Sequence, residues 1–224
     1  MVRRTKEDAL ATRSSLLDAA ELLFQAQGVS RTSLADIARE AGTTRGAIYW
    51  HFKDKADLFN AMMERVTLPL EQSFETADRE KPGQDPLGRI RDVLKSGFEL
   101  ISTDDRTRRV FEVVTHKVEY IDELQAVRVR HLTCRDEFLG RIEDGLKQAI
   151  KSQGLVAPVS PATAAHGLHA LLDGLLQNWL LDPSGFELAS TGEQVMDVYL
   201  RGLGLKLDLH TKAPVRSMAP KDAG

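Results

Sequence analysis

Between residues 44 and 55 the chain gathers guanidinium, phenol, indole, imidazole and ammonium groups in one short stretch. At about 100° per residue, Arg45, Gly46, Tyr49 and Trp50 fall on one side of a helix, and apolar side chains fall on the other. Arginine can bond a guanine edge or a phosphate, and exposed aromatic rings mark a contact surface. Glycine lets another surface approach the backbone closely. This set of four residues, the recognition ridge, predicts contact with DNA.

The segments that must position the ridge have the order of a helix-turn-helix. One helix begins at Ser33, whose hydroxyl can cap it. After a glycine-containing turn, the next helix begins at Thr44 and ends at about His51. We therefore expect a DNA-binding head over residues 1–54, with the helix-turn-helix at about 33–52. The alternative interpretation is a plain three-helix packing unit with exposed aromatic side chains.

Polar side chains beside the ridge are further candidates for DNA contact. The hydroxyl and the first amides of a helix attract phosphate, and basic or imidazole side chains can reach the same backbone. These candidates are Ser33, Thr43, Thr44, His51 and Lys55.

The rest of the chain also predicts helices, because strand-like alternation bounded by turn residues is absent from the sequence. Pro69 predicts a kink or an end of a helix near Leu68. We expect an all-α protein of about nine helices, with a ligand-binding and dimerisation body over 55–207 and a disordered tail over 208–224. Outside the helix-turn-helix, the expected helices span about 6–27, 54–68, 86–102, 104–116, 121–152, 161–181 and 188–205.

Composition points to one large or two modest domains in a reducing compartment. The 224 residues include a single cysteine, which fits the cytoplasm. The basic N-terminus lacks the apolar run of a signal peptide, and no apolar segment approaches the ~20 residues that cross a membrane. The net charge is −3, yet residues 1–55 hold nine Lys or Arg against seven Asp or Glu. A mildly basic head on an acidic body fits local contact with phosphate.

The segment TRGAIYWHFKDKADL closely resembles the DNA-binding head of the TetR family of transcriptional regulators. The resemblance implies that Arg45 and Gly46 face bases and that phosphates are held by Tyr49, His51 and Lys55. It also implies a cytoplasmic homodimer that binds a palindromic operator in double-stranded DNA, without a cofactor.

In the body, TRRVFEVVTHKVEY resembles the branch of this family that represses tripartite multidrug efflux pumps. This implies a repressor that leaves its operator when it binds a small hydrophobic or amphiphilic inducer, such as an antibiotic, a phenolic compound or a dye. One alternative is a TetR-type regulator of a metabolic or biosynthetic operon. A more remote one is a helical enzyme, which the sequence disfavours because it has no nucleophile–base set, phosphate loop or metal-ligand spacing.

A ligand pocket in the body is expected where apolar helix faces meet a few polar groups. The family resemblance places Asp173 and Gln177 at pocket positions and makes Cys134 a pocket wall. A buried Asp173 would select cationic or hydrogen-bonding compounds. For each apolar candidate, ordinary core packing is the alternative. The expected pocket residues are Leu94, Phe98, Ile101, Phe111, Thr115, Cys134, Phe138, Leu172, Asp173, Leu176 and Gln177.

The helix expected at 161–181 also has a face of small residues, which would let two subunits approach closely about a twofold axis. On its polar stripe, His166 and His169 stand three residues apart, but no cysteine or tight His/Glu cluster accompanies them, so no metal site is expected. The residues expected at the dimer interface are Gly167, Ala170, Gly174 and Asn178.

Overall fold

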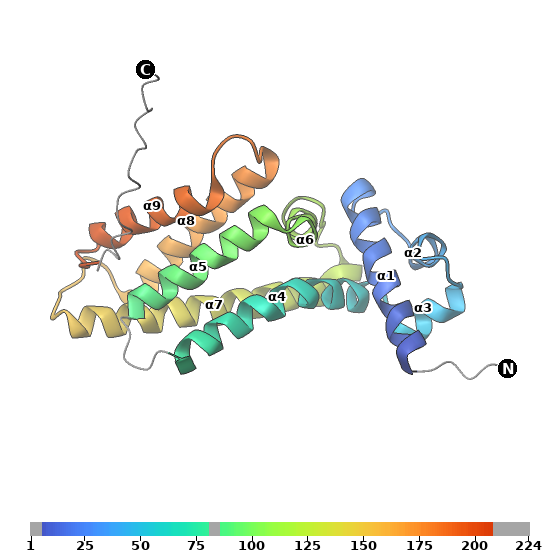
Figure 1. Ribbon diagram of the computed structural model, residues 1–224, viewed down its shortest axis with the longest axis horizontal. Coiled ribbons are helices and arrows are strands. Elements are labelled where there is room, and N and C mark those ends of the chain that lie inside the picture. The colour runs from blue at the N-terminus through green and yellow to red at the C-terminus, as the bar shows by residue number, and fades with distance from the viewer. Residues whose placement is uncertain (1–5, 81–85, 208–224) are drawn as a thin grey trace, which may run out of the picture.

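The computed structural model describes residues 6–80 and 86–207. Every regular secondary-structure element within these residues is an α-helix or a 3₁₀ helix. The all-α prediction is confirmed. A head of three helices joins a longer helical body, and α4 leads from one into the other (Figure 1). The helices are α1 (Lys6–Gln27), α2 (Leu34–Glu40), α3 (Arg45–His51), α4 (Lys55–Glu80), α5 (Pro86–Thr103), α6 (Asp105–His116), the 3₁₀ turn η1 (Asp122–Leu124), α7 (Gln125–Ser152), α8 (Pro161–Leu181) and α9 (Leu188–Gly202).

Side-chain caps start the two short helices of the head where the sequence predicts them. The Ser33 hydroxyl accepts a hydrogen bond from the Asp36 amide at 3.1 Å, and the Asp36 carboxylate accepts one from the Ser33 amide at 3.2 Å. The Thr44 hydroxyl accepts from the Ala47 amide at 3.2 Å. Gly42, in the turn between α2 and α3, has a φ of +64°, which glycine adopts without a steric penalty. The caps and the turn together orient α3.

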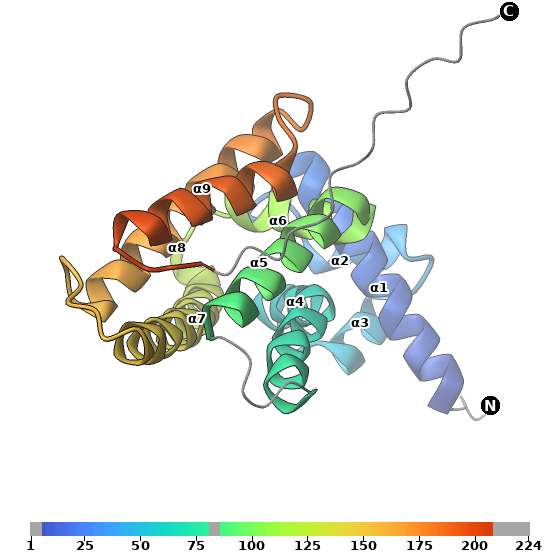
Figure 2. The ribbon, with the colours of Figure 1, turned by 60° about the vertical axis from the view of Figure 1, so that its left-hand side comes forward.

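The body is a bundle in which α5 lies between α4 and α9 (Figures 1 and 2). Helix α7 packs along α8, and α5 packs along α9. The apolar faces of these helices meet in one core, to which Leu87, Phe98, Leu146, Leu168 and Leu200 contribute. Burial of these faces drives the assembly of helices whose other sides are polar.

A second hydrophobic core crosses from the head into the body. Phe24 and Ile37 of the head pack in the same cluster as Met62 of α4 and as Val110 and Val113 of α6. Close-packed interiors transmit displacement instead of absorbing it. The orientation of the head therefore depends on where α4 and α6 lie.

A buried carboxylate reinforces this junction. Glu21 of α1 is 2% exposed and pairs with Arg65 of α4 at 3.2 Å and with Arg106 and Arg109 of α6 at 3.5 and 4.0 Å. Burial raises the pKa of Glu21, while the arginines oppose the rise. These pairs tie the first helix of the head to the two body helices that share its core.

The prediction of a break near Pro69 is wrong in one respect, because α4 continues through this residue to Glu80. A proline lacks the amide of one helical hydrogen bond, but it does not end a helix that packing holds on one side. Leu58, Met62 and Val66 anchor the preceding turns in the core shared by head and body.

Two other boundaries differ slightly from expectation. Helix α7 begins at Gln125, after η1, and α9 ends at Gly202. Residues 1–5, residues 81–85 and the predicted disordered tail from residue 208 lie outside the described residues.

Candidate DNA-binding surface and ligand cavity

The recognition ridge faces outward from α3. Tyr49 is 49% and Trp50 74% exposed, whereas Ile48, on the opposite side of α3, is fully buried. The Arg45 guanidinium lies 5.8 Å from the centre of the Tyr49 ring, and the Trp50 ring meets the His51 ring edge-on at 4.7 Å. The predicted orientation of the ridge is confirmed. It is a basic and aromatic surface on a short helix that is fixed from behind.

The polar candidates beside the ridge differ in exposure. Ser33, Thr44 and Tyr49 are exposed, and Thr43 and His51 are half-buried. The hydroxyls of Ser33 and Thr44 already accept the capping bonds described above. The remaining amides at these helix starts favour an anion.

Lys55 differs from its expected role. Its ammonium group is buried, donates to the carbonyls of Ser30 and Thr32 at 3.2 Å each, and lies 3.3 Å from the Glu123 carboxylate. Lys55 therefore ties the start of α4 to the loop before α2 and to η1, and its charge is already paired. Lys55 lines a surface hollow together with Arg45, Tyr49 and the exposed Lys53.

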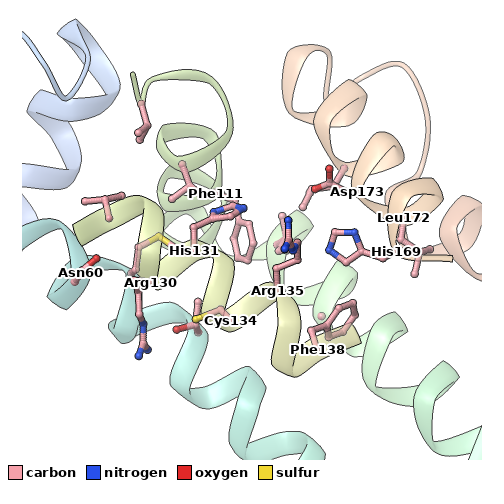
Figure 3. A pocket seen from close by; sticks show the side chains of 18 of the residues that line it. Asn60, Phe111, Arg130, His131, Cys134, Arg135, Phe138, His169, Leu172 and Asp173 are labelled. Atoms are coloured by element: carbon pink, nitrogen blue, oxygen red, sulfur yellow. The ribbon is translucent and has the colours of Figure 1, made fainter. Parts of the chain in front are cut away.

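A cavity of about 450 Å³ lies inside the body, between α4, α5, α6, α7 and α8 (Figure 3). That volume suits a small organic ligand, since ligand sites span about 300–1,000 Å³. Most of its lining is apolar or aromatic. The expected pocket residues that line it are Leu94, Phe98, Ile101, Phe111, Cys134, Phe138, Leu172, Asp173 and Leu176.

Two expected pocket residues are not part of the lining. Thr115 is half-buried on α6, and Gln177 lies on the exposed side of α8. Gln177 is one helical turn beyond Asp173 and donates a hydrogen bond to its carboxylate at 2.6 Å. Asp173 itself is exposed, so it is not the buried carboxylate that the sequence suggested. Gln177 is therefore linked to the cavity lining through its bond to Asp173.

Helix α4 supplies a wall of the cavity that the sequence analysis missed. Phe59, Asn60, Met63 and Thr67 line it. The last three are spaced as residues i, i+3 and i+7, so helical periodicity could have grouped them. Asn60 Oδ1 and Thr67 Oγ1 are buried and have no hydrogen-bond partner in the described part of the chain. Buried polar atoms without partners are rare, and these two can bind a ligand.

The far side of the cavity is lined by basic side chains of α7 and α8. Arg130, His131 and Arg135 come from α7, and His169 comes from α8 (Figure 3). Burial lowers the pKa of His169, and the positive charge of Arg135 adds to that effect while Asp173 opposes it. Burial therefore favours the neutral form of His169.

The expected dimer residues do not all face the same way. An added Cβ at Gly167 would lie 2.2 Å from the Tyr199 hydroxyl, so this glycine makes room for α9 of its own chain. An added Cβ at Gly174 would have no described atom of the chain within 4 Å, apart from its own neighbours and helix backbone. Ala170 and Asn178 are exposed. On the adjoining helix α9, Val198 is also exposed, which the sequence analysis did not single out.

Over residues 6–80 and 86–207 no three His, Cys, Asp or Glu side chains are grouped as metal ligands would be. Over the same residues no helix is both long and apolar enough to span a bilayer.

A capped helix-turn-helix with an outward basic and aromatic ridge, joined to a helical body that contains a cavity, defines a DNA-binding transcription regulator. Residues 16–62 match the family described as bacterial regulatory proteins, tetR family, and residues 85–205 match the C-terminal region of MAATS-type transcriptional repressors. The chain belongs to the TetR family.

Similar proteins cover almost the whole chain. It is 38% identical to the transcriptional regulator AcrR of Shigella flexneri over 89% of this chain and 93% of AcrR. It is also 38% identical to TtgR of Pseudomonas putida, over 92% and 97% of the two chains. The solved structure of NalD of Pseudomonas aeruginosa has a TM-score of 0.79 at 36% identity, covering 88% of this chain and 97% of NalD. The SmeT–triclosan complex has a TM-score of 0.77 at 31% identity, covering 94% and 100%.

These similarities confirm the predicted family and the resemblance to efflux-pump repressors. The chain is a helix-turn-helix repressor of the TetR type and not an enzyme. NalD is described as the secondary repressor of the MexAB-OprM multidrug efflux pump, and SmeT as the repressor of the SmeDEF pump of Stenotrophomonas maltophilia.

Proposed function

We propose that this chain forms a cytoplasmic homodimer that represses a multidrug efflux pump operon and leaves its palindromic operator when a small hydrophobic or amphiphilic compound enters the cavity. The relatives that are named as efflux-pump repressors support the target. The structure of SmeT with triclosan supports a small-molecule inducer. A predominantly apolar cavity, with unpartnered polar atoms in its wall, supports ligand binding by this chain.

The recognition ridge is the part of the proposed site that reads DNA. Its exposed Arg45 can bond a guanine edge, and the Tyr49 and Trp50 rings can pack against the backbone and bases. Phosphates are bound at the starts of α2 and α3, near Ser33, Thr43 and Thr44, and by His51. The phosphate contact that was expected of Lys55 is assigned to Lys53, because the Lys53 side chain is exposed and Lys55 is buried.

Helix α4 carries the proposed coupling between the recognition ridge and the ligand cavity. Its contacts with both the head and the cavity wall are the observation that supports the proposed function most directly. Its first residue, Lys55, is bonded to the loop before α2, and its next turns carry Asn60, Met63 and Thr67 into the cavity wall. A ligand that favours another position of α4 therefore favours another orientation of the head. Differential affinity for two states is what lets ligand binding weaken DNA binding.

The proposed dimer forms through the outer faces of α8 and α9. Ala170, Gly174 and Asn178 offer a close approach, and Leu181 and Val198 expose apolar surface beside them. A twofold pair of heads fits two half-sites of a palindrome about 34–36 Å apart.

The proposal can be tested with the full chain and the DNA upstream of the neighbouring pump genes. Fluorescence anisotropy should show binding to this duplex, and triclosan should reverse it. A duplex of equal length without an inverted repeat is the control for sequence preference. Equal affinity for both duplexes, or binding that triclosan and a panel of antibiotics leave unchanged, would refute the proposed function.

A further inference from the structure

The segment between α6 and α7, residues 117–124, contacts both the ligand cavity and the head. Val118 and Tyr120 line the cavity. The Lys117 carbonyl accepts a hydrogen bond from the amide of Val29, in the head, at 3.1 Å. Figure 1 shows this α6–α7 segment, in yellow-green, beside α1 at the head end of α4. The segment therefore joins the cavity wall to the head in addition to α4.

The α6–α7 segment is short and internally bonded. The amide of Ile121 donates to the Glu119 carbonyl, and the amide of Leu124 donates to the Ile121 carbonyl, both at 2.8 Å. Leu124 is fully buried in the core that head and body share, and η1 packs against α4. Close-packed groups transmit displacement instead of absorbing it. A displacement of Val118 or Tyr120 therefore reaches η1.

Within η1, the Glu123 side chain contacts the head. Its carboxylate lies 3.3 Å from the Lys55 ammonium group, which also donates to the carbonyls of Ser30 and Thr32 at 3.2 Å each. Glu123 also lines the surface hollow to which Arg45 of the recognition ridge contributes. The Lys55 ammonium group thus joins three parts of the chain: η1, the first turn of α4 and the loop that leads into α2.

The two partners of this ion pair differ in burial. The Lys55 side chain is 7% exposed, whereas that of Glu123 is 57% exposed. A buried ammonium group must keep its partners, and Lys55 retains two carbonyls when the carboxylate is removed. A pair with one exposed partner adds little to stability. Glu123 can therefore determine where η1 and α4 lie relative to each other without holding the fold together.

We infer, on the basis of the proposed function, that Glu123 is a positioning residue that conveys ligand binding to the recognition helix. A ligand that displaces Val118 or Tyr120 displaces η1, and the Glu123 carboxylate then shifts Lys55 together with the starts of α4 and α2. The ligand thereby favours one orientation of the head, which is the condition for linkage between the two sites. Glu123 acts in this way without touching the ligand.

The test measures the coupling ratio of the full chain, that is, the Kd for operator DNA with saturating triclosan divided by the Kd without it. The wild-type ratio should lie at about 5–150. Glu123→Ala should lower this ratio at least about threefold. Calorimetry should show an unchanged affinity of the DNA-free chain for triclosan, because Glu123 does not line the cavity. Glu123→Gln should keep part of the ratio, since its amide oxygen can still accept a hydrogen bond from Lys55.

Glu119→Ala is the matched control, because it removes an exposed glutamate of the same segment that does not line the cavity. It should leave the coupling ratio at its wild-type value.

A ratio that Glu123→Ala leaves unchanged, or that Glu119→Ala lowers equally, overturns the inference, while a coupled wild-type chain keeps the proposed function. This holds even if Glu123→Ala binds DNA more tightly, because a charge that merely repels phosphates acts equally with and without triclosan. If triclosan does not release the wild-type chain from DNA, a compound of the antibiotic panel that does so replaces it. Release by none of them overturns both the inference and the proposed function.

Discussion

Replacing Gly192 with alanine tests how the fold sets the shape of the ligand cavity. Gly192 is buried in α9, and an added Cβ would lie 2.3 Å from Cε2 and 2.5 Å from Cδ2 of Phe98 on α5. Such contacts are too short for carbon atoms, so the Phe98 ring or the helices must move. Overpacking of this kind costs about 1–3 kcal/mol, and alanine recovers about 1 kcal/mol of helix propensity. The free energy of unfolding should therefore fall by roughly 0–2 kcal/mol.

The Gly192→Ala substitution should also change ligand affinity, although residue 192 does not line the cavity. Phe98 lines the cavity, and a ring pushed away from α9 moves toward the cavity space. Triclosan should bind more weakly to Gly192→Ala than to the wild-type chain. Urea unfolding and calorimetric titration measure the two effects on the same protein.

Gly140→Ala is the control for this prediction. Gly140 is exposed on α7, and an added Cβ there meets no described atom within 4 Å. This variant should gain up to about 1 kcal/mol from helix propensity and keep its ligand affinity. A Gly192→Ala protein that is as stable as Gly140→Ala and binds triclosan like the wild type would refute the reasoning about the α5–α9 contact.

Three further predictions address the cavity wall, the head–body junction and the ridge. Thr67→Val removes a buried hydroxyl that has no hydrogen-bond partner among the described residues and keeps the side-chain shape. The free energy of unfolding, measured by urea titration, should therefore rise by up to about 1 kcal/mol. A loss of stability would show that the hydroxyl is paired. Because burial raises the pKa of Glu21, folding favours its protonated form, and this contribution is complete below the unfolded pKa near 4.5 and declines as pH rises through the folded pKa. Glu21→Gln should therefore flatten the fall of unfolding free energy above pH 4.5, and an unchanged pH profile would contradict this. Arg45→Ala should weaken operator binding by about 1–3 kcal/mol more than binding to random DNA, and equal losses would assign Arg45 to phosphate.

Local signals in the sequence predicted the head well. Ser33 and Thr44 cap their helices through bonds that span three residues, so neighbours along the chain determine them. The outward direction of Tyr49 and Trp50 follows from helical periodicity once Ile48 is assigned to the core. Both features depend on short segments, which is why one sequence was enough.

Features that depend on tertiary contacts were harder to predict. The partners of Lys55 are two loop carbonyls and a carboxylate from η1, far along the chain. Gly167 looks like a dimer residue until Tyr199 is seen to occupy the space beside it. In the same way, an apolar residue of α4 can pack in the core or line a cavity. These two roles can be distinguished only when the packing of the five helices around the cavity is known.

The central claim is that the cavity and the recognition ridge are coupled through α4, and one pair of titrations tests it directly. The affinity of triclosan is measured for the free chain and for its complex with operator DNA, and the affinity of the chain for that DNA is measured with and without saturating triclosan. Thermodynamic linkage requires both ratios to be equal, and a coupled repressor should show about 5–150-fold weakening in each. Triclosan that binds the DNA complex as tightly as it binds the free chain would contradict the account.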